Sequence, residues 1–204
     1  MADKYVNYEQ LASVEKEGKD YRIRYGTRAS PVLIFGPHAG RIEPGTSELV
    51  TSVAREDLSF YLFEGIKSQG NNELHITSTH FDEPLALDLL MSCDKTIAFH
   101  GEKSETEQIY IGGRDIELRS LIAQSLNKAG FKTAKHSRDA LQGTSKDNVC
   151  NRCRSGAGLQ LEIPRGIRRL FFHSLISSGP MQKREEFHRF VDAVRAGLKR
   201  ANGL

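Results

Sequence analysis

The chain lacks any long hydrophobic run. No apolar stretch approaches the roughly 20 residues that span a bilayer, so no membrane partner is expected. The opening segment, Met1 to Lys19, is polar and charged and lacks the apolar core of a secretory signal. We therefore expect a protein made in the cytoplasm without a signal peptide, which would need another route of release to act outside the cell.

Cysteine is scarce as well. The three cysteines, Cys93, Cys150 and Cys153, are too few and odd in number for a disulfide framework. Cys150 and Cys153 form a C-x-x-C pair, but the chain has no second such pair to complete a structural zinc ribbon. We interpret all three residues as ordinary thiols.

A strong excess of charge of one sign is also missing. The sequence has 29 Lys and Arg against 26 Asp and Glu, a formal net charge of +3. Nucleic-acid-binding domains carry a stronger and more clustered basic charge, so no nucleic-acid partner is expected. The mild positive excess would nevertheless not repel a polyanionic substrate.

What the sequence does contain is an alternation of strand and helix patterns. At 204 residues, with 38% hydrophobic residues, the chain has the size of one domain, and we assign residues 1–204 to it. The alternation predicts an α/β layered fold with a mixed or mostly parallel sheet. The polar segment 139–155 is interpreted as a functional loop. Strands are predicted at 31–35, 58–63, 74–79, 95–100, 108–111, 131–136 and 158–164, and helices at 45–55 (capped by Thr46 or Ser47), 84–93, 115–128 and 181–200.

Chemistry-bearing side chains lie in or directly after three of the predicted strands. His38 and Glu43 lie in PHAGRIEPG, His100 ends KTIAFH, and Glu162 lies in LQLEIP. Sites in such sheets gather at the carboxyl ends of the strands. A catalytic zinc takes about three protein ligands plus an open position for water, and two His with one Glu is an established set. We therefore predict a zinc site on His38, Glu43 and His100, with Glu162 as the base that receives the proton of the water.

Each of these residues, taken alone, is also compatible with an ordinary structural side chain. The set is informative because three strand ends contribute to it, and because a charged Glu162 within an apolar strand is costly to bury without a partner. The remaining histidines have no comparable setting and are interpreted as structural or surface residues: His75, His80, His136, His173 and His188.

Longer segments resemble a known family. PHAGRIEPGTSEL, FHGE, IYIGGRD and NVCNRCRSGAGLQLEIPRGIR, with the spacing between them, resemble the phage and Bacillus poly-γ-glutamate hydrolases from about Val32 to Arg195. The resemblance implies an open three-layer α/β/α sandwich with a mixed sheet, a minimal relative of the zinc carboxypeptidases.

The resemblance also implies the roles of site residues. It places zinc on His38, Glu43 and His100 and assigns the base to Glu162. The zinc carboxypeptidases separate the first His and Glu ligands by two residues, whereas four residues separate His38 from Glu43. Glu48 therefore stays open as an alternative ligand.

The implied substrate, poly-γ-glutamate, carries one α-carboxylate per residue, and arginine binds carboxylates with two parallel hydrogen bonds. We expect Arg41, Asn151, Arg152 and Arg165 to contact substrate or the developing oxyanion. Three further arginines that are close to the site in sequence are interpreted as solvated surface residues: Arg154, Arg168 and Arg169.

Together these expectations describe a monomeric, zinc-dependent hydrolase that cleaves γ-glutamyl amide bonds within poly-γ-glutamate. By resemblance, a phage enzyme of this kind is released at host lysis and degrades the capsule of neighbouring cells. Two alternatives stay open: a zinc-dependent deacylase of small N-acyl amino acids, and a non-catalytic module that binds polyanions. A chelator would inactivate either enzyme but leave a binding module unaffected.

Overall fold

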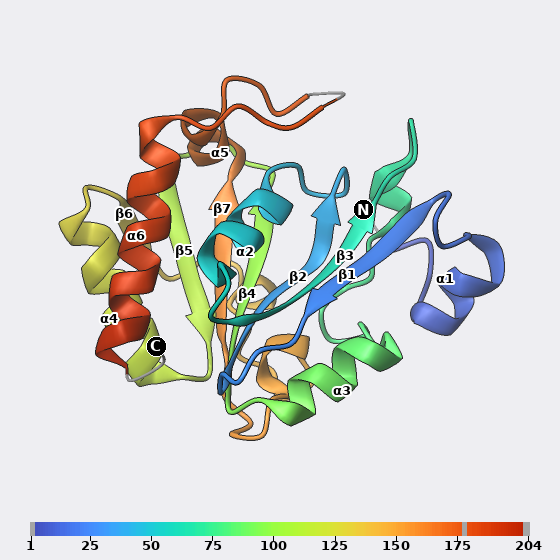
Figure 1. The fold of residues 1–204 in the computed structure, drawn as a ribbon, viewed down its shortest axis with the longest axis horizontal. Coiled ribbons are helices and arrows are strands. Elements are labelled where there is room, and N and C mark those ends of the chain that lie inside the picture. The colour runs from blue at the N-terminus through green and yellow to red at the C-terminus, as the bar shows by residue number, and fades with distance from the viewer. Residues whose placement is uncertain (1–2, 177–178, 202–204) are drawn as a thin grey trace.

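The chain forms a mixed sheet with helices on both faces (Figure 1). The computed structural model describes residues 3–176 and 179–201. Within these residues, seven strands form one sheet in the order β1-β3-β2-β4-β7-β5-β6. The strands are β1 (Tyr21–Gly26), β2 (Val32–Gly40), β3 (Ser59–Gly65), β4 (Lys95–Glu102), β5 (Gln108–Gly113), β6 (Lys132–Ala134) and β7 (Leu159–Pro164).

Four adjacent strands run in the same direction. β3, β2, β4 and β7 are mutually parallel, whereas β1 pairs antiparallel with β3 and β5 pairs antiparallel with β7. β6 is parallel to β5. The carboxyl ends of the four parallel strands therefore meet at one edge of the sheet, where the sites of open α/β sheets gather.

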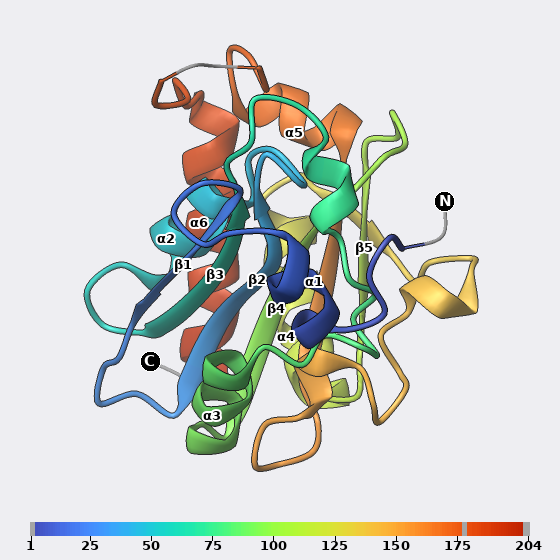
Figure 2. The same ribbon diagram turned by 90° about the vertical axis from the view of Figure 1, so that its right-hand side faces the viewer.

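Helices α2, α4 and α6 cover one face of the sheet, and α1 and α3 cover the other (Figures 1 and 2). None of the helices within residues 3–176 and 179–201 combines the length and apolar character needed to cross a membrane. The helices are α1 (Tyr8–Val14), α2 (Thr46–Ala54), α3 (Pro84–Ser92), α4 (Ile116–Lys128), α5 (Arg165–Phe171) and α6 (Glu185–Arg200).

Alternation along the strands sends side chains into two apolar cores. In β2, Val32 and Ile34 belong to the core shared with α2, α4 and α6, whereas Leu33 and Phe35 belong to the core shared with α1 and α3. A strand that is buried on both faces has a continuous apolar sequence, which is why the segment PVLIF predicted β2 correctly. The three-layer α/β/α arrangement with a mixed sheet is confirmed.

One predicted strand, 74–79, is wrong. Asn71–Leu74 form a 3₁₀ turn, and the following residues run as a loop that pairs with no strand among the described residues. Leu74 and Ile76 are fully buried, so they produce an alternating pattern without a β-ladder. The loop covers the apolar core with every second side chain, and this explains why its sequence alternates like that of a strand.

The predicted cap of α2 is also wrong. Gly45, with φ 96°, is the N-cap residue, and a Cβ there would lie 2.7 Å from the ring of Phe172. Only glycine adopts this left-handed conformation readily. Thr46 Oγ1 instead donates to the carbonyl of Glu43 at 2.7 Å, which fixes the loop between β2 and α2.

Other boundaries differ in smaller ways. The sequence did not predict α1, β1 or α5, and α6 begins at Glu185 rather than at residue 181. β1 is an edge strand with two arginines, so it lacks a clear apolar alternation. The predicted loop 139–155 holds two 3₁₀ turns, Asp139–Leu141 and Val149–Asn151.

Candidate metal centre and active site

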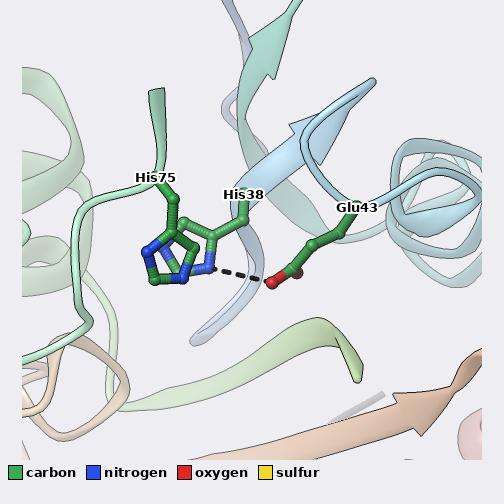
Figure 3. A group of neighbouring side chains, drawn as sticks. All are labelled: His38, Glu43 and His75. Carbon is green, nitrogen blue, oxygen red and sulfur yellow. Dashed lines mark ion pairs between the residues drawn. The ribbon is translucent and has the colours of Figure 1, made fainter. Parts of the chain in front are cut away.

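The predicted site residues lie at the carboxyl edge of the parallel strands. His38 lies in β2, His100 in β4 and Glu162 in β7. His100 and Glu162 are direct neighbours in the register of β4 and β7. Glu43 lies in the loop that joins β2 to α2, and it points back toward His38 (Figure 3).

Three metal-ligating groups converge at this edge. His38 Nδ1 lies 3.2 Å from His100 Nδ1 and 3.4 Å from Glu43 Oε1. His100 Nδ1 lies 4.0 Å from Glu43 Oε2. Both imidazoles are buried, with His38 1% and His100 3% exposed. Groups from three separate segments therefore surround one point, as the zinc prediction requires.

The hydrogen bonds of the two imidazoles suit a metal. His38 Nε2 lies 2.7 Å from the carbonyl oxygen of Ile76. Because a carbonyl only accepts, Nε2 must carry a hydrogen, and Nδ1 is the atom left for a metal. His100 Nε2 is buried without any hydrogen-bond partner in the described part of the chain. No protein group other than the cluster itself therefore competes for His100, and the donor set fits a divalent metal such as zinc.

Glu43 is held as an ionised carboxylate. Its Oε2 accepts a 2.7 Å hydrogen bond from the amide of Gly101. A Cβ at Gly101 would lie 2.8 Å from the Glu43 Cβ, so only glycine allows this approach. Burial opposes ionisation, but His38, His100 and the Gly101 amide outweigh it and lower the pKa of Glu43 to about 2. Glu48, the alternative ligand, lies in α2 and lines a different cavity with Arg22 and Arg24.

His75, interpreted from the sequence as structural or surface, lies beside this cluster. Its ring lies against that of His38, tilted by 31° with centroids 3.9 Å apart (Figure 3), and ligand atoms of His38, Glu43 and His75 all lie within 4.8 Å of one another. His75 Nδ1 donates to Asp3 Oδ1 at 2.7 Å. Electrostatic interaction with the neighbouring His38, and burial, lower the pKa of His75 to about 4. Because 74–79 was predicted as a strand, no pattern in the sequence indicated that His75 would reach the site.

Glu162 is buried beside the cluster. It is 6% exposed, and burial, with repulsion from Glu43 and Glu102, raises its pKa well above the usual range. Gln160 Nε2 donates a 2.9 Å hydrogen bond to Glu162 Oε1. Gln160 is itself fixed, because its Oε1 accepts from Asn148 Nδ2 at 3.0 Å. No residue in the described ranges hydrogen-bonds to Glu162 Oε2, so that oxygen is free to exchange a proton.

Comparison with known proteins now decides the family. The model of the poly-γ-glutamate hydrolase family matches residues 5–193. The chain belongs to the poly-γ-glutamate hydrolase family. It is therefore a hydrolase, as the sequence pattern predicted, and not a non-catalytic module.

Individual relatives of the family are similar over nearly the whole chain. YmaC of Bacillus subtilis (strain 168) is 40% identical over 201 residues, which cover 97% of this chain and 85% of YmaC. A structure of a bacteriophage poly-γ-glutamate hydrolase is 37% identical, with a TM-score of 0.94 over 99% of both chains. A zinc-free apo structure of YndL is 37% identical, with a TM-score of 0.91 over 98% of this chain and 99% of that one.

In this family member, Arg168 is not the surface residue that the sequence suggested. It is 4% exposed, and its guanidinium donates to the carbonyls of Ile163 (3.1 Å), Pro44 (2.6 Å) and Glu102 (2.9 Å). These carbonyls lie one residue after Glu162, one after Glu43 and two after His100. One buried cation thus ties together the three segments that carry the site. Arg154 and Arg169 are solvent-exposed, as predicted.

The predicted substrate contacts have different settings. Asn151 Nδ2 donates to the carbonyls of Gly143 and Ser145, each at 2.7 Å, and Arg152 donates to three backbone carbonyls. Both side chains therefore hold the 139–155 loop and its neighbours. Arg41 lines the cavity beside α2 and donates to the carbonyl of Lys67 at 2.9 Å. Arg165 lines a second cavity beside Glu43 and pairs with Glu105 at 2.5 Å.

Proposed function

We propose that this hydrolase is a zinc-dependent enzyme that cleaves γ-glutamyl amide bonds within poly-γ-glutamate, with His38, Glu43 and His100 as zinc ligands and Glu162 as the base. The observation that carries the proposal is the convergence of the two Nδ1 atoms and the Glu43 carboxylate within 4.0 Å. The zinc-free state described for YndL supports zinc as the metal.

The residues divide the chemistry between them. A bound zinc would polarise the scissile carbonyl and increase the acidity of water. Glu162 takes a proton from the attacking water through its free Oε2 and later gives it to the leaving amide nitrogen, so the C–N bond breaks with protons balanced. Burial raises the pKa of Glu162, and a raised pKa suits a group that must both accept and return a proton. Gln160 keeps the other oxygen fixed.

Two neighbouring cavities suit a long polymer, and Glu43 of the metal centre lines one of them. A cavity of about 760 Å³ beside Arg41 and one of about 780 Å³ beside Arg165 share Pro44 and Leu175 in their linings. A polymer can therefore extend to both sides of the Glu43 loop, which favours cleavage within the chain. We keep Arg41 and Arg165 as direct substrate contacts and assign Asn151 and Arg152 the support of the 139–155 loop.

The wider biological role rests on the family. We propose that residues 1–204 act as one catalytic domain and as a monomer. We further propose that the protein is released by host lysis and degrades extracellular polymer, as suits a chain similar to a bacteriophage enzyme.

The test combines metal analysis with a polymer assay. Purified protein should contain one zinc per chain and should lower the viscosity of poly-γ-glutamate faster than it releases chain ends. EDTA should abolish activity, and added zinc should restore it. Equal cleavage of N-acetylglutamate would favour the small-molecule deacylase, and full activity in EDTA would remove the metal from the mechanism.

A further inference from the structure

A basic cavity adjoins the candidate metal centre on the side of α5. Its volume is about 780 Å³, and its lining includes Glu43 and Gly101, which belong to the metal centre. Five cationic side chains line it: Lys103, Arg165, Arg168, Arg169 and Arg184. Glu43 is the one acidic residue in this lining, so the cavity has a large excess of positive charge for a protein of near-neutral composition.

These cations are not equally available to a ligand. The guanidinium of Arg168 is used by three backbone carbonyls, and Arg165 and Arg169 share the carboxylate of Glu105. Lys103 and Arg184, by contrast, have no side-chain hydrogen bond or ion pair among the described residues. Both are exposed, one directly after β4 and the other directly before α6. These two cations can therefore meet an anion without first giving up a protein partner, which Arg165 would have to do.

The cavity also has an apolar wall. Pro44, Phe172 and Leu175 contribute to its lining beside the cations. A γ-linked glutamate chain has two methylene groups of each residue in its backbone and one α-carboxylate beside them. Such a chain is an apolar thread with regularly spaced anions, and it complements an apolar wall bordered by cations.

We propose that this basic cavity binds the α-carboxylates of the glutamate residues next to the scissile amide, with Lys103 and Arg184 as the contacting cations. The inference rests on the proposed function, because it takes the cavity to be the part of the substrate groove nearest the metal. Binding here would hold the scissile amide beside Glu162, so the two residues determine substrate affinity and not the chemical step.

The test removes both free charges and keeps the metal centre. The double variant Lys103→Met/Arg184→Met should raise KM for poly-γ-glutamate by at least about tenfold, since hydrogen bonds between charged groups are the stronger class. Its kcat and zinc content should stay within about twofold of wild type, because no group that handles the proton has changed. Lys103→Arg/Arg184→Lys should restore most of the affinity.

A matched control uses two cations away from the site. Arg114 directly follows β5 at the opposite edge of the sheet and Lys128 ends α4, and Arg114→Met/Lys128→Met removes the same net charge. This control should leave KM unchanged. An equal rise of KM in both double variants would show a general effect of net charge and would overturn the cavity assignment, as would an unchanged KM in Lys103→Met/Arg184→Met.

Equilibrium binding separates this proposal from the function on which it rests. Fluorescently labelled poly-γ-glutamate is titrated into the full-length Glu162→Gln protein, with and without the two Met substitutions. An increase of at least about tenfold in the Kd for the polymer upon the two Met substitutions supports the cavity as a binding site. This holds even if the wild-type protein fails to cleave the polymer, and in that case only the proposed function is wrong. An unchanged Kd overturns the assignment of the cavity as a substrate-binding site. If the wild-type protein still cleaves the polymer, the proposed function is not affected by that result.

Discussion

His100 and His75 lie beside the same residue, His38, but in opposite settings. His100 lies on the central strand β4, is 3% exposed, and has a buried Nε2 without a partner among the described residues. His75 lies in the loop after the Asn71–Leu74 turn, its side chain is 35% exposed, and it is tied to Asp3. Both rings contact His38, with centroids 5.0 Å away for His100 and 3.9 Å for His75.

The difference indicates which histidine the fold reserves for a metal. A buried polar atom without a partner costs free energy, about 1–3 kcal/mol for a neutral group. His100 bears that cost at Nε2, while its Nδ1 lies 3.2 Å from His38 Nδ1 and 4.0 Å from Glu43 Oε2, so a metal in the cluster would bind Nδ1. His75 instead lies in a loop with its side chain 35% exposed, although its hydrogen bond to Asp3 is of a kind that metal-bound histidines also make. We therefore expect removal of His100 to affect the metal far more than removal of His75.

The largest effect is expected from His100→Gln. Loss of a direct ligand should weaken zinc binding by more than about 100-fold, because even outer-shell partners contribute about 10–100-fold. Activity should fall with metal content. Zinc affinity is measured by competition with a chromophoric chelator, and circular dichroism verifies the fold. Normal zinc content in this variant would show that the metal is held by His38, Glu43 and His75 instead.

The second-largest effect is expected from Glu162→Gln, which should lower kcat nearly as much as His100→Gln does but leave the metal in place. Removal of a general base typically costs about 10²–10⁴ in rate. Glutamine keeps the size of the side chain and its hydrogen bond to Gln160, so zinc content and melting temperature should match wild type. Hydrolysis of poly-γ-glutamate at saturating substrate gives kcat. Wild-type turnover in this variant would assign the proton transfer to another residue.

Gln160→Met should have an intermediate effect. It removes the hydrogen bond to Glu162 Oε1, which contributes about 1.5 kcal/mol, or about tenfold in kcat if it acts on the base. That hydrogen bond lowers the pKa of Glu162, so its loss raises the pKa further. The ionised base is present above its pKa and lost as pH falls through it, so the acidic limb of the rate profile should move to higher pH.

The control for this prediction is Gln124→Met on the exposed face of α4. It should change neither kcat nor the pH profile. A Gln160→Met protein with lower stability but an unshifted acidic limb would reduce Gln160 to a packing role.

The strand residues and the loop residues around His38 also differ in how well the sequence predicted their positions. His100 follows the mostly apolar run TIAF and Glu162 lies in the alternating segment LQLEIP, and both patterns predict strands whose carboxyl ends meet at one edge of a parallel sheet. His38 lies in β2 and Glu43 in the loop that follows it for the same reason. The strand pattern thus predicted the parts of the site that regular structure positions.

The positions of the loop residues around His38 could not be predicted from strand patterns. His75 reaches the site through a loop whose buried Leu74 and Ile76 imitate a strand, and Asp3 contacts it from 72 residues away along the chain. The role of Arg168 was hidden for a related reason, because its partners are backbone carbonyls of three distant segments. Backbone acceptors carry no sequence signature, so tertiary contacts of this kind appear only in the structure.

The smallest effect is expected from His75→Gln. If His75 supports His38 and does not bind zinc directly, zinc affinity should fall by no more than about tenfold, the lower end for an outer-shell partner. Asp3→Asn, which weakens the 2.7 Å contact to His75 Nδ1 but leaves the ring in place, should have a similar or smaller effect. The same chelator competition measures both variants beside His100→Gln. A loss of zinc in His75→Gln as large as that in His100→Gln would remove the distinction between the two histidines, because it would mean that His75 also binds zinc directly.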